Sequence, residues 1–294
     1  MDQINLTSST RANLLSLQST STIIARTQER LATGLKVNSA LDDALAFFKA
    51  RNLNARASDL SAIKDQVSNA VNTIKASIQG LETIEDILKQ MRALAQSAIS
   101  APESSTRAKL ASQFNELRNQ VDNVAEDAHY NGYNLLKNTS ESFSPGADQL
   151  TVKFNERIGA KSTNALVVSG LRTSDFNKII GQSAVTIGTG TAVWGQTGTA
   201  AVTAIRAALS SIDSALVTVR QAAQDFGTKS AVLQIRIDFT QNLINTLHSG
   251  ASELVNADLN QEAANLLSAQ TRQELGTVSL SIAQQSDQAV LTLF

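Results

Sequence analysis

The chain has 294 residues, a formal net charge of −1 and a pI near 6.2, so neither nucleic acid nor an anionic membrane is an expected partner. Cysteine is absent, which excludes disulfides and thiolate chemistry. Apolar residues make up 42% of the chain, aromatic residues only 4%, and there are two prolines, a composition that favours long helices in a thin bundle. The first residues lack the pattern of a cleaved signal peptide, and no run of about 18 apolar residues predicts a membrane span. Export, if it occurs, is expected to need no cleaved signal.

Residues 11–35 form the first predicted helix. Its apolar face is weak, because two of the seven positions at three-four spacing are polar: Leu14, Leu17, Ser21, Ile24, Gln28, Leu31 and Leu35. An isolated helix of this quality is marginal in water, so we expect it to become ordered only with partners. Gly34 is expected to end the helix in the left-handed conformation.

Residues 38–43 are predicted to start a second helix, with Ser39 as its cap and Asp42 and Asp43 in its first turn. Its seam, the apolar row that faces a partner helix, ends before Pro102 and contains Leu60, Ile63, Val67, Ala70, Ile74, Ser77, Leu81, Ile84, Leu88, Met91, Ala95 and Ala98. Residues 103–128 predict a third helix, and Asn131-Gly132 predicts a turn.

Residues 139–201 lose the helical period and are rich in Ser, Thr and Gly. Leu150, Val152 and Phe154 alternate as in a half-buried strand, and residues 165–168 and 184–187 are weaker strand candidates. We therefore expect a small β-rich insert in the middle of the chain.

Residues 202–254 carry the longest seam. A helix of this length spans about 80 Å and cannot bury its seam alone, so it must pack on the earlier helices. Gly250 weakens the pattern and residues 256–258 restart it, which together suggest a hinge. The last predicted helix, residues 259–294, places Leu275, Val278, Ile282, Ala289 and Leu293 on one face.

These elements predict a mainly α fold: a long antiparallel coiled coil or helical bundle built from both ends of the chain, with a small central insert that contains a β-hairpin. The expected divisions are residues 1–44, 45–138, 139–201, 202–254 and 255–294, with the two terminal segments paired. The bundle seam is assigned to Leu60, Ile63, Val67, Ile74, Leu81, Leu88, Leu209, Leu216, Phe226, Leu233 and Ile244.

Catalytic and metal sites are not predicted. His129 and His248 are the only histidines, and neither has a second ligand at metal-binding spacing. Asp42 and Asp43 are explained more simply as helix-capping residues. The sequence therefore predicts no enzyme, no cofactor and no metal, and it leaves glycosylation at its two Asn-x-Ser/Thr tripeptides open.

Short motifs at both ends carry a resemblance. Residues 31–43 read LATGLKVNSALDD, residues 91–98 read MRALAQSA, and residues 130–136 read YNGYNLL. Near the C-terminus the pattern continues through residues 256–258, Glu262, Gln270, Gly276 and residues 290–293, with Phe294 departing from it. In this order the motifs resemble bacterial flagellin with a short middle region, over residues 1–138 and 202–294.

The resemblance implies a structural subunit of the extracellular flagellar filament, exported unfolded through the flagellar type III apparatus. Its partners would be copies of itself in a helical homopolymer, an export chaperone, and the hook-associated junction and cap proteins. Terminal helices of flagellins form an inner tube around a channel, which assigns this role to Leu14, Leu17, Ile24, Leu31, Leu275, Val278, Ile282 and Leu293.

Two other interpretations remain open. A hook–filament junction protein has the same terminal helices but forms a single ring, and a stand-alone coiled-coil adaptor would be monomeric with stable terminal helices. Flagellins that activate their innate Toll-like receptor carry an Arg and a Glu where this chain has Gln90 and Gln113, while Leu94 matches. The resemblance therefore implies weak recognition by that receptor.

Overall fold

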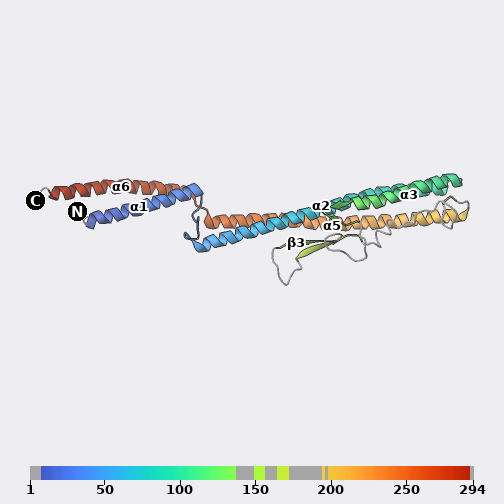
Figure 1. Cartoon of the computed structure of the whole chain (residues 1–294), viewed down its shortest axis with the longest axis horizontal. Coiled ribbons are helices and arrows are strands. Elements are labelled where there is room, and N and C mark those ends of the chain that lie inside the picture. The colour runs from blue at the N-terminus through green and yellow to red at the C-terminus, as the bar shows by residue number, and fades with distance from the viewer. Residues whose placement is uncertain (1–7, 137–148, 156–163, 172–193, 196–197, 292–294) are drawn as a thin grey trace. The chain divides into compact units, whose positions relative to one another are not determined.

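The computed structural model describes residues 8–136, 149–155, 164–171, 194–195 and 198–291. These residues form five helices: α1 (Ser8–Thr33), α2 (Ala44–Ser100), α3 (Ser104–Asp127), α5 (Thr199–Val255) and α6 (Leu259–Leu291) (Figure 1). Two small antiparallel sheets complete the fold, so the predicted mainly α class with a β-containing insert is confirmed. The chain divides into two compact units, which we call the terminal unit (residues 1–57 and 245–294) and the bundle unit (residues 58–244).

The bundle unit is built from α2, α3 and α5. Three polar pairs fix the antiparallel register of α2 and α5: Lys64 with Gln241 at 3.0 Å, Glu85 with Arg220 at 2.9 Å, and Arg92 with Asp213 at 3.0 Å. Each step forward along α2 is matched by an equal step back along α5. This constant register is the geometry of a coiled-coil seam.

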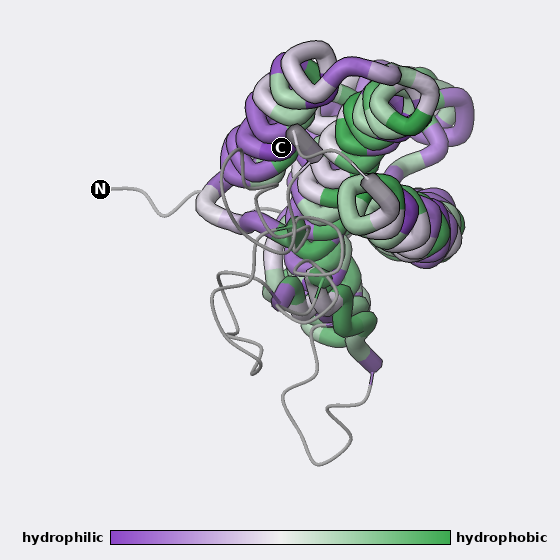
Figure 2. Tube along the Cα trace, turned by 90° about the vertical axis from the view of Figure 1, so that its right-hand side faces the viewer, coloured by the Kyte–Doolittle hydropathy of each residue, from purple (hydrophilic) through white to green (hydrophobic). Residues whose placement is uncertain are grey.

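One continuous core fills this unit. Its most buried side chains come from all three helices and include Ile74, Leu81, Ile84, Leu88, Phe114, Ile205 and Ile212. Polar and apolar residues alternate around the helices in Figure 2, as expected when one face of each is buried. Ser77 is buried within the seam, but its hydroxyl donates to the Thr73 carbonyl at 3.0 Å, which removes the cost of an unpaired polar group.

Two hairpins cover the bundle. The first pairs β1 (His129–Tyr130) with β2 (Tyr133–Asn134) through Asn131 at φ 50° and Gly132 at φ 83°, which confirms the predicted turn. The second pairs β3 (Gln149–Lys153) with β4 (Ala165–Ser169), as predicted for both strands, and buries Leu150, Val152 and Val168. The strand expected at residues 184–187 lies outside the described residues.

A buried arginine joins the insert to the turn between α2 and α3. Arg107 donates its Nε hydrogen to the Trp194 carbonyl at 3.0 Å and an Nη1 hydrogen to the Ala101 carbonyl at 2.8 Å. The Trp194 ring packs on Phe114 with centroids 4.9 Å apart. These contacts anchor the returning chain just before α5, and neither Arg107 nor Trp194 was identified from the sequence.

The terminal unit pairs α1 with α6 in antiparallel fashion, so that their outer ends lie together (Figure 1). Gly34 ends α1 at φ 72°, as predicted, and its carbonyl accepts a hydrogen bond from the Ala257 amide at 2.9 Å. Asp258 caps α6 by accepting the Asn260 amide at 2.9 Å. The predicted pairing of the chain ends is therefore present.

Two expectations about helix ends were wrong. Helix α2 begins at Ala44, because the Asp43 carboxylate accepts the Ala46 amide at 2.9 Å and acts as the cap that was assigned to Ser39. Residues 39–42 form a turn in which the Asp42 carboxylate accepts the Ser39 amide at 3.0 Å, since an ionised carboxylate is a stronger acceptor than a hydroxyl. Helix α5 also continues through Gly250 to Val255, so the break in helical structure lies at residues 256–258 alone.

Candidate functional site

Nothing in the described part of the chain resembles a reactive centre. No group of three or more His, Cys, Asp or Glu residues there is placed to hold a metal ion. One helix, α5, contains a stretch apolar enough by length and composition to cross a membrane. The core helix of a bundle passes the same test, and α5 buries Ile205, Ile212 and Val219 inside the bundle unit. The candidate site is therefore sought on the surface of the helices.

The face that α6 turns toward α1 is narrow and poor in large apolar residues. Only two of its members, Leu266 and Leu280, are large and apolar. Its buried or half-buried positions follow a three-four spacing: Glu262, Leu266, Ala269, Gly276, Leu280 and Ala283. On the α1 side, Thr10 and Thr27 are buried and Leu17 lies against Gly276. This contact brings the helices close together but removes little apolar area from water.

The opposite face of α6 carries the larger apolar side chains. Leu267, Leu275, Val278 and Ile282 are 66%, 63%, 57% and 62% exposed, and they lie about 180–260° around the helix from Gly276. The usual rule for an amphipathic helix is thus inverted, because the more apolar face points away from the partner helix. We call these four residues the outer α6 face.

Helix α1 adds further exposed apolar side chains to the terminal unit. Leu14, Leu15 and Ile23 are exposed, while the predicted assembly residues Leu17, Ile24 and Leu31 are half-buried. Several large apolar side chains exposed on one helix pair indicate a surface for protein association. Leu293 lies outside the described residues.

Sequence reasoning identified three residues of the outer α6 face and missed others. Leu275, Val278 and Ile282 were assigned to assembly, but Leu267, Leu15 and Ile23 were not. Leu267 lies eight residues, or about two turns, before Leu275 on the same side of α6, so extending the row toward the N-terminus in two steps of four would have found it. Leu15 and Ile23 have no such signal, since they fall between the positions of the three-four row.

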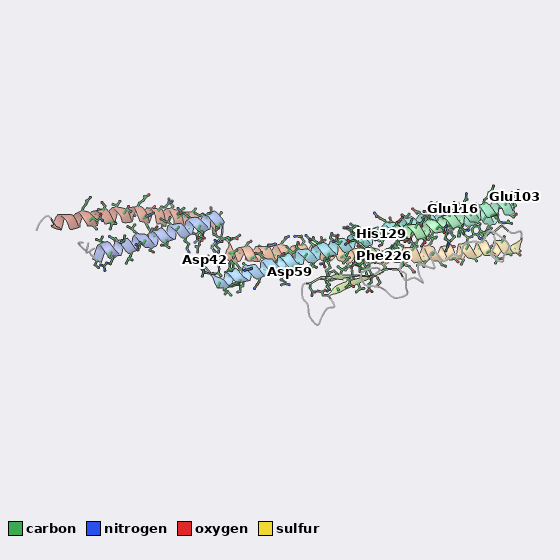
Figure 3. All side chains as sticks on the ribbon, in the orientation of Figure 1. Asp42, Asp59, Glu103, Glu116, His129 and Phe226 are labelled. Carbon is green, nitrogen blue, oxygen red and sulfur yellow. The ribbon has the colours of Figure 1, made fainter. Side chains whose placement is uncertain are left out.

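The residues assigned to the bundle seam lie inside the bundle unit. Nine of them are buried: Leu60, Val67, Ile74, Leu81, Leu88, Leu216, Phe226, Leu233 and Ile244. Ile63 and Leu209 are half-buried against the same core. Figure 3 labels Phe226 on α5, where its side chain is 2% exposed.

The turn before α2 carries a perturbed carboxylate. The pKa of Asp42 is lowered, first by the backbone amide of Ser39 and then by the Ser39 hydroxyl, which both donate to it. Arg26 on α1 lies 3.7 Å from the same carboxylate. The turn between α1 and α2 is thereby held by charge-assisted hydrogen bonds.

The positions aligned with the innate-receptor contact come together on the bundle unit. Gln90, Leu94 and Gln113 line one shallow surface groove between α2 and α3. Glu116, labelled on α3 in Figure 3, lines the same groove. Gln90 and Gln113 are exposed and neutral. The groove therefore offers no guanidinium or carboxylate at the two positions where the receptor-activating flagellins carry them.

Long helices around a buried seam, with a paired terminal unit that exposes apolar side chains, are typical of a structural subunit rather than a catalyst. Family models for the bacterial flagellin N-terminal and C-terminal helical regions match residues 4–141 and 209–294. The chain belongs to the bacterial flagellin family, whose members are structural proteins of the extracellular flagellar filament.

Individual relatives agree with this family over their whole length. The chain is 32% identical to flagellin FljM and 33% identical to flagellin FljO of Caulobacter vibrioides, covering 100% of this chain and 99% of each relative. A solved structure named for a flagellar hook-associated protein of Vibrio parahaemolyticus aligns with a TM-score of 0.57 at 15% identity. It covers 73% of this chain and 100% of that one, and at this identity it supports the fold alone.

Proposed function

We propose that this chain self-assembles into the flagellar filament, and that the outer α6 face joins one subunit to the next. The carrying observation is that Leu267, Leu275, Val278 and Ile282 are exposed although a partner helix lies on the other side of α6. Burying such side chains is worth about 1.5–3 kcal/mol each, which a polymer of identical subunits would gain at every joint. Leu14, Leu15 and Ile23 on α1 are further exposed apolar side chains that neighbouring subunits would bury.

Export fits the same terminal unit. Its helices have weak amphipathic faces, and helices of that kind are marginal alone in water. A chain whose ends become ordered only in the assembly is suited to pass unfolded through the flagellar type III apparatus, with a chaperone covering the exposed apolar residues. The hook-associated junction and cap proteins would then contact the polymer at its two ends.

A polymerisation assay with purified subunits tests the assembly proposal. Replacing Leu275, Val278 and Ile282 together by Gln should abolish filaments in electron micrographs and in sedimentation, because the joint would then bury amides in place of apolar groups. The matched control replaces the same residues by other apolar ones, Leu275→Ile, Val278→Ile and Ile282→Val, and should still polymerise. Filaments from the Gln variant at the wild-type concentration would contradict the proposal.

The alternative is a hook–filament junction protein, which the fold also fits because the aligned Vibrio structure is a hook-associated protein by name. Labelling of the protein on cells decides between the two. Signal along the whole filament supports the filament subunit, whereas a single focus at the filament base supports the junction protein.

A further inference from the structure

The register of α1 and α6, which is the alignment of one helix along the other, is not explained by large apolar side chains. Large apolar side chains, which usually define how two helices slide past each other, lie mostly on the outer face of α6. The inner face has two large apolar residues, Leu266 and Leu280, and both are only half-buried, beside Ala269 and Gly276. Two half-buried leucines specify the register weakly, so a further feature is needed to fix which residue of α1 lies opposite which residue of α6.

Gly276 provides such a feature. A Cβ atom built on Gly276 would lie 2.7 Å from Leu17 Cδ2 and 3.2 Å from Leu17 Cγ. Turning Leu17 about its Cβ–Cγ bond moves Cδ2 away but leaves Cγ in place, so Cγ must also shift by a few tenths of an ångström, through the first side-chain torsion or through separation of the helices. Leu17 thus occupies the space that a side chain at position 276 would fill, as a knob occupies a hole.

A second contact lies four turns away on the same pair. Arg30 Nη1 donates to Glu262 Oε1 at 3.0 Å, and the Glu262 side chain is 11% exposed. From Leu17 to Arg30 the chain advances by thirteen residues, and from Gly276 to Glu262 it returns by fourteen. The two contacts therefore belong to one antiparallel register, which the Ala257 to Gly34 hydrogen bond continues.

Sliding α6 by one turn would break both contacts. Leu17 would then lie against Arg272 or Leu280, the residues four positions from Gly276, and would meet a charged or a bulky side chain in place of a hole. Arg30 would lose Glu262, leaving a largely buried carboxylate without this partner. The register seen in the structure is the one that satisfies both ends.

We propose that Gly276 is the residue that sets the register of the terminal helix pair, by accepting Leu17, and that filament assembly depends on this register. The inference rests on the proposed function, because the register decides how far along the pair the exposed residues of α1 lie from those of the outer α6 face. Gly276 itself is a positioning residue, since it acts on the joint between subunits through the alignment of the two helices.

Whether a glycine-to-alanine substitution raises or lowers the critical concentration for polymerisation tests the proposal. Alanine is the better helix former, so at an open helical position it favours the helix. Gly227 on α5 is such a position, with no heavy atom of another residue within 4 Å of the added Cβ, and Gly227→Ala serves as the matched control. We expect Gly276→Ala to raise the critical concentration for polymerisation by about tenfold or more, and Gly227→Ala to leave it unchanged.

A compensating change separates this contact from a general effect of the substitution. Leu17→Ala removes the atoms that the new Cβ would meet, so the double variant Leu17→Ala, Gly276→Ala should polymerise at a lower concentration than Gly276→Ala alone. Thermal unfolding of the bundle unit should be the same in every variant except Gly227→Ala, because Leu17 and Gly276 belong to the terminal unit.

The experiment distinguishes failure of the register proposal from failure of the proposed function. If the wild-type protein forms no filaments, the proposed function fails. If the wild type polymerises and Gly276→Ala does so at the same or a lower concentration, the register proposal is overturned. It is also overturned if Leu17→Ala gives no recovery in the double variant.

Discussion

The two units of this chain use apolar residues in opposite ways. The bundle unit turns its seam inward, so that Leu81 and Leu88 are fully buried by the unit itself. The terminal unit turns Leu267 and Leu275 outward, and its helix pair leaves even inward-facing leucines such as Leu17 only half-buried. A unit of the first kind is stable alone, whereas a unit of the second kind gains most of its apolar burial from other molecules. The comparison assigns stability to one unit and association to the other.

Removing α6 should have the largest effect, and it should fall on one unit only. A chain that lacks about its last thirty residues loses all four residues of the outer α6 face, so we expect no filaments in sedimentation and electron microscopy. The bundle unit should retain its helical circular dichroism and a cooperative thermal transition. Filaments from the truncated chain, or loss of the thermal transition of the bundle unit, would contradict the assignment of association to the terminal unit and of stability to the bundle unit.

Two leucine truncations sharpen the contrast. Leu81→Ala or Leu216→Ala should lower the free energy of unfolding of the monomer by about 2–5 kcal/mol, because each removes buried atoms and leaves a cavity. Leu275→Ala should leave monomer unfolding nearly unchanged, since its side chain is 63% exposed, and should weaken polymerisation instead. Denaturant titration and critical-concentration measurements on the same samples provide the test. A monomer equally destabilised by Leu275→Ala would contradict the distinction.

A close helix approach inside the bundle unit gives a smaller effect. The Cβ atom added by Gly80→Ala would lie 2.7 Å from Ala128 Cβ and 2.7 Å from Leu136 Cδ1. Ala128 has no rotatable side chain, so the backbone must move, and we expect the variant to be destabilised by about 1–3 kcal/mol in denaturant titration. The control Gly227→Ala should be neutral or slightly stabilising, and a stabilised Gly80→Ala would show that the two helices have room to separate.

The positions expected to contact the innate receptor, Gln90, Leu94 and Gln113, lie in the bundle unit. With neutral amides at Gln90 and Gln113, the purified monomer should be a weak agonist in a receptor reporter assay, because the guanidinium and carboxylate of the active flagellins are both missing. The double variant Gln90→Arg, Gln113→Glu should raise potency by about tenfold, the value of one additional charge-assisted contact. Full potency of the wild-type monomer would refute this interpretation.

Acid should have the smallest effect on the bundle unit. The pKa of Glu85 is lowered, first by the hydrogen bond from Arg220, so the ionised carboxylate stabilises the fold at pH values above its ordinary pKa. That stabilisation disappears as the pH falls below the ordinary pKa of a glutamate and through the lowered pKa of Glu85. Because Arg220 is 59% exposed, the contribution is at most about 1 kcal/mol. Stability curves of wild type and Glu85→Gln should converge in this acid range, and a constant difference would contradict the assignment.

The helices and the bundle seam could be predicted because each repeats a local pattern over many turns. The start of α2 could not, since Ser39, Asp42 and Asp43 are all plausible caps and only the folded turn shows which acceptor each amide uses. The row of Leu275, Val278 and Ile282 was visible in the sequence, but its direction away from α1 was not. Periodicity shows that a face exists, whereas the partner that covers it depends on contacts distant in sequence, such as Leu17 with Gly276 and Arg107 with Trp194.

The buried indole provides an optical probe of one unit only. Trp194 is the single tryptophan of the chain and is 1% exposed against Phe114, so its emission should be blue-shifted when the insert is docked. Because residues 101–114 are far from Trp194 in sequence, this environment forms only after a long loop closes. Fluorescence recorded during refolding would therefore time the closure of the bundle, in the same cuvette in which light scattering times the growth of filaments.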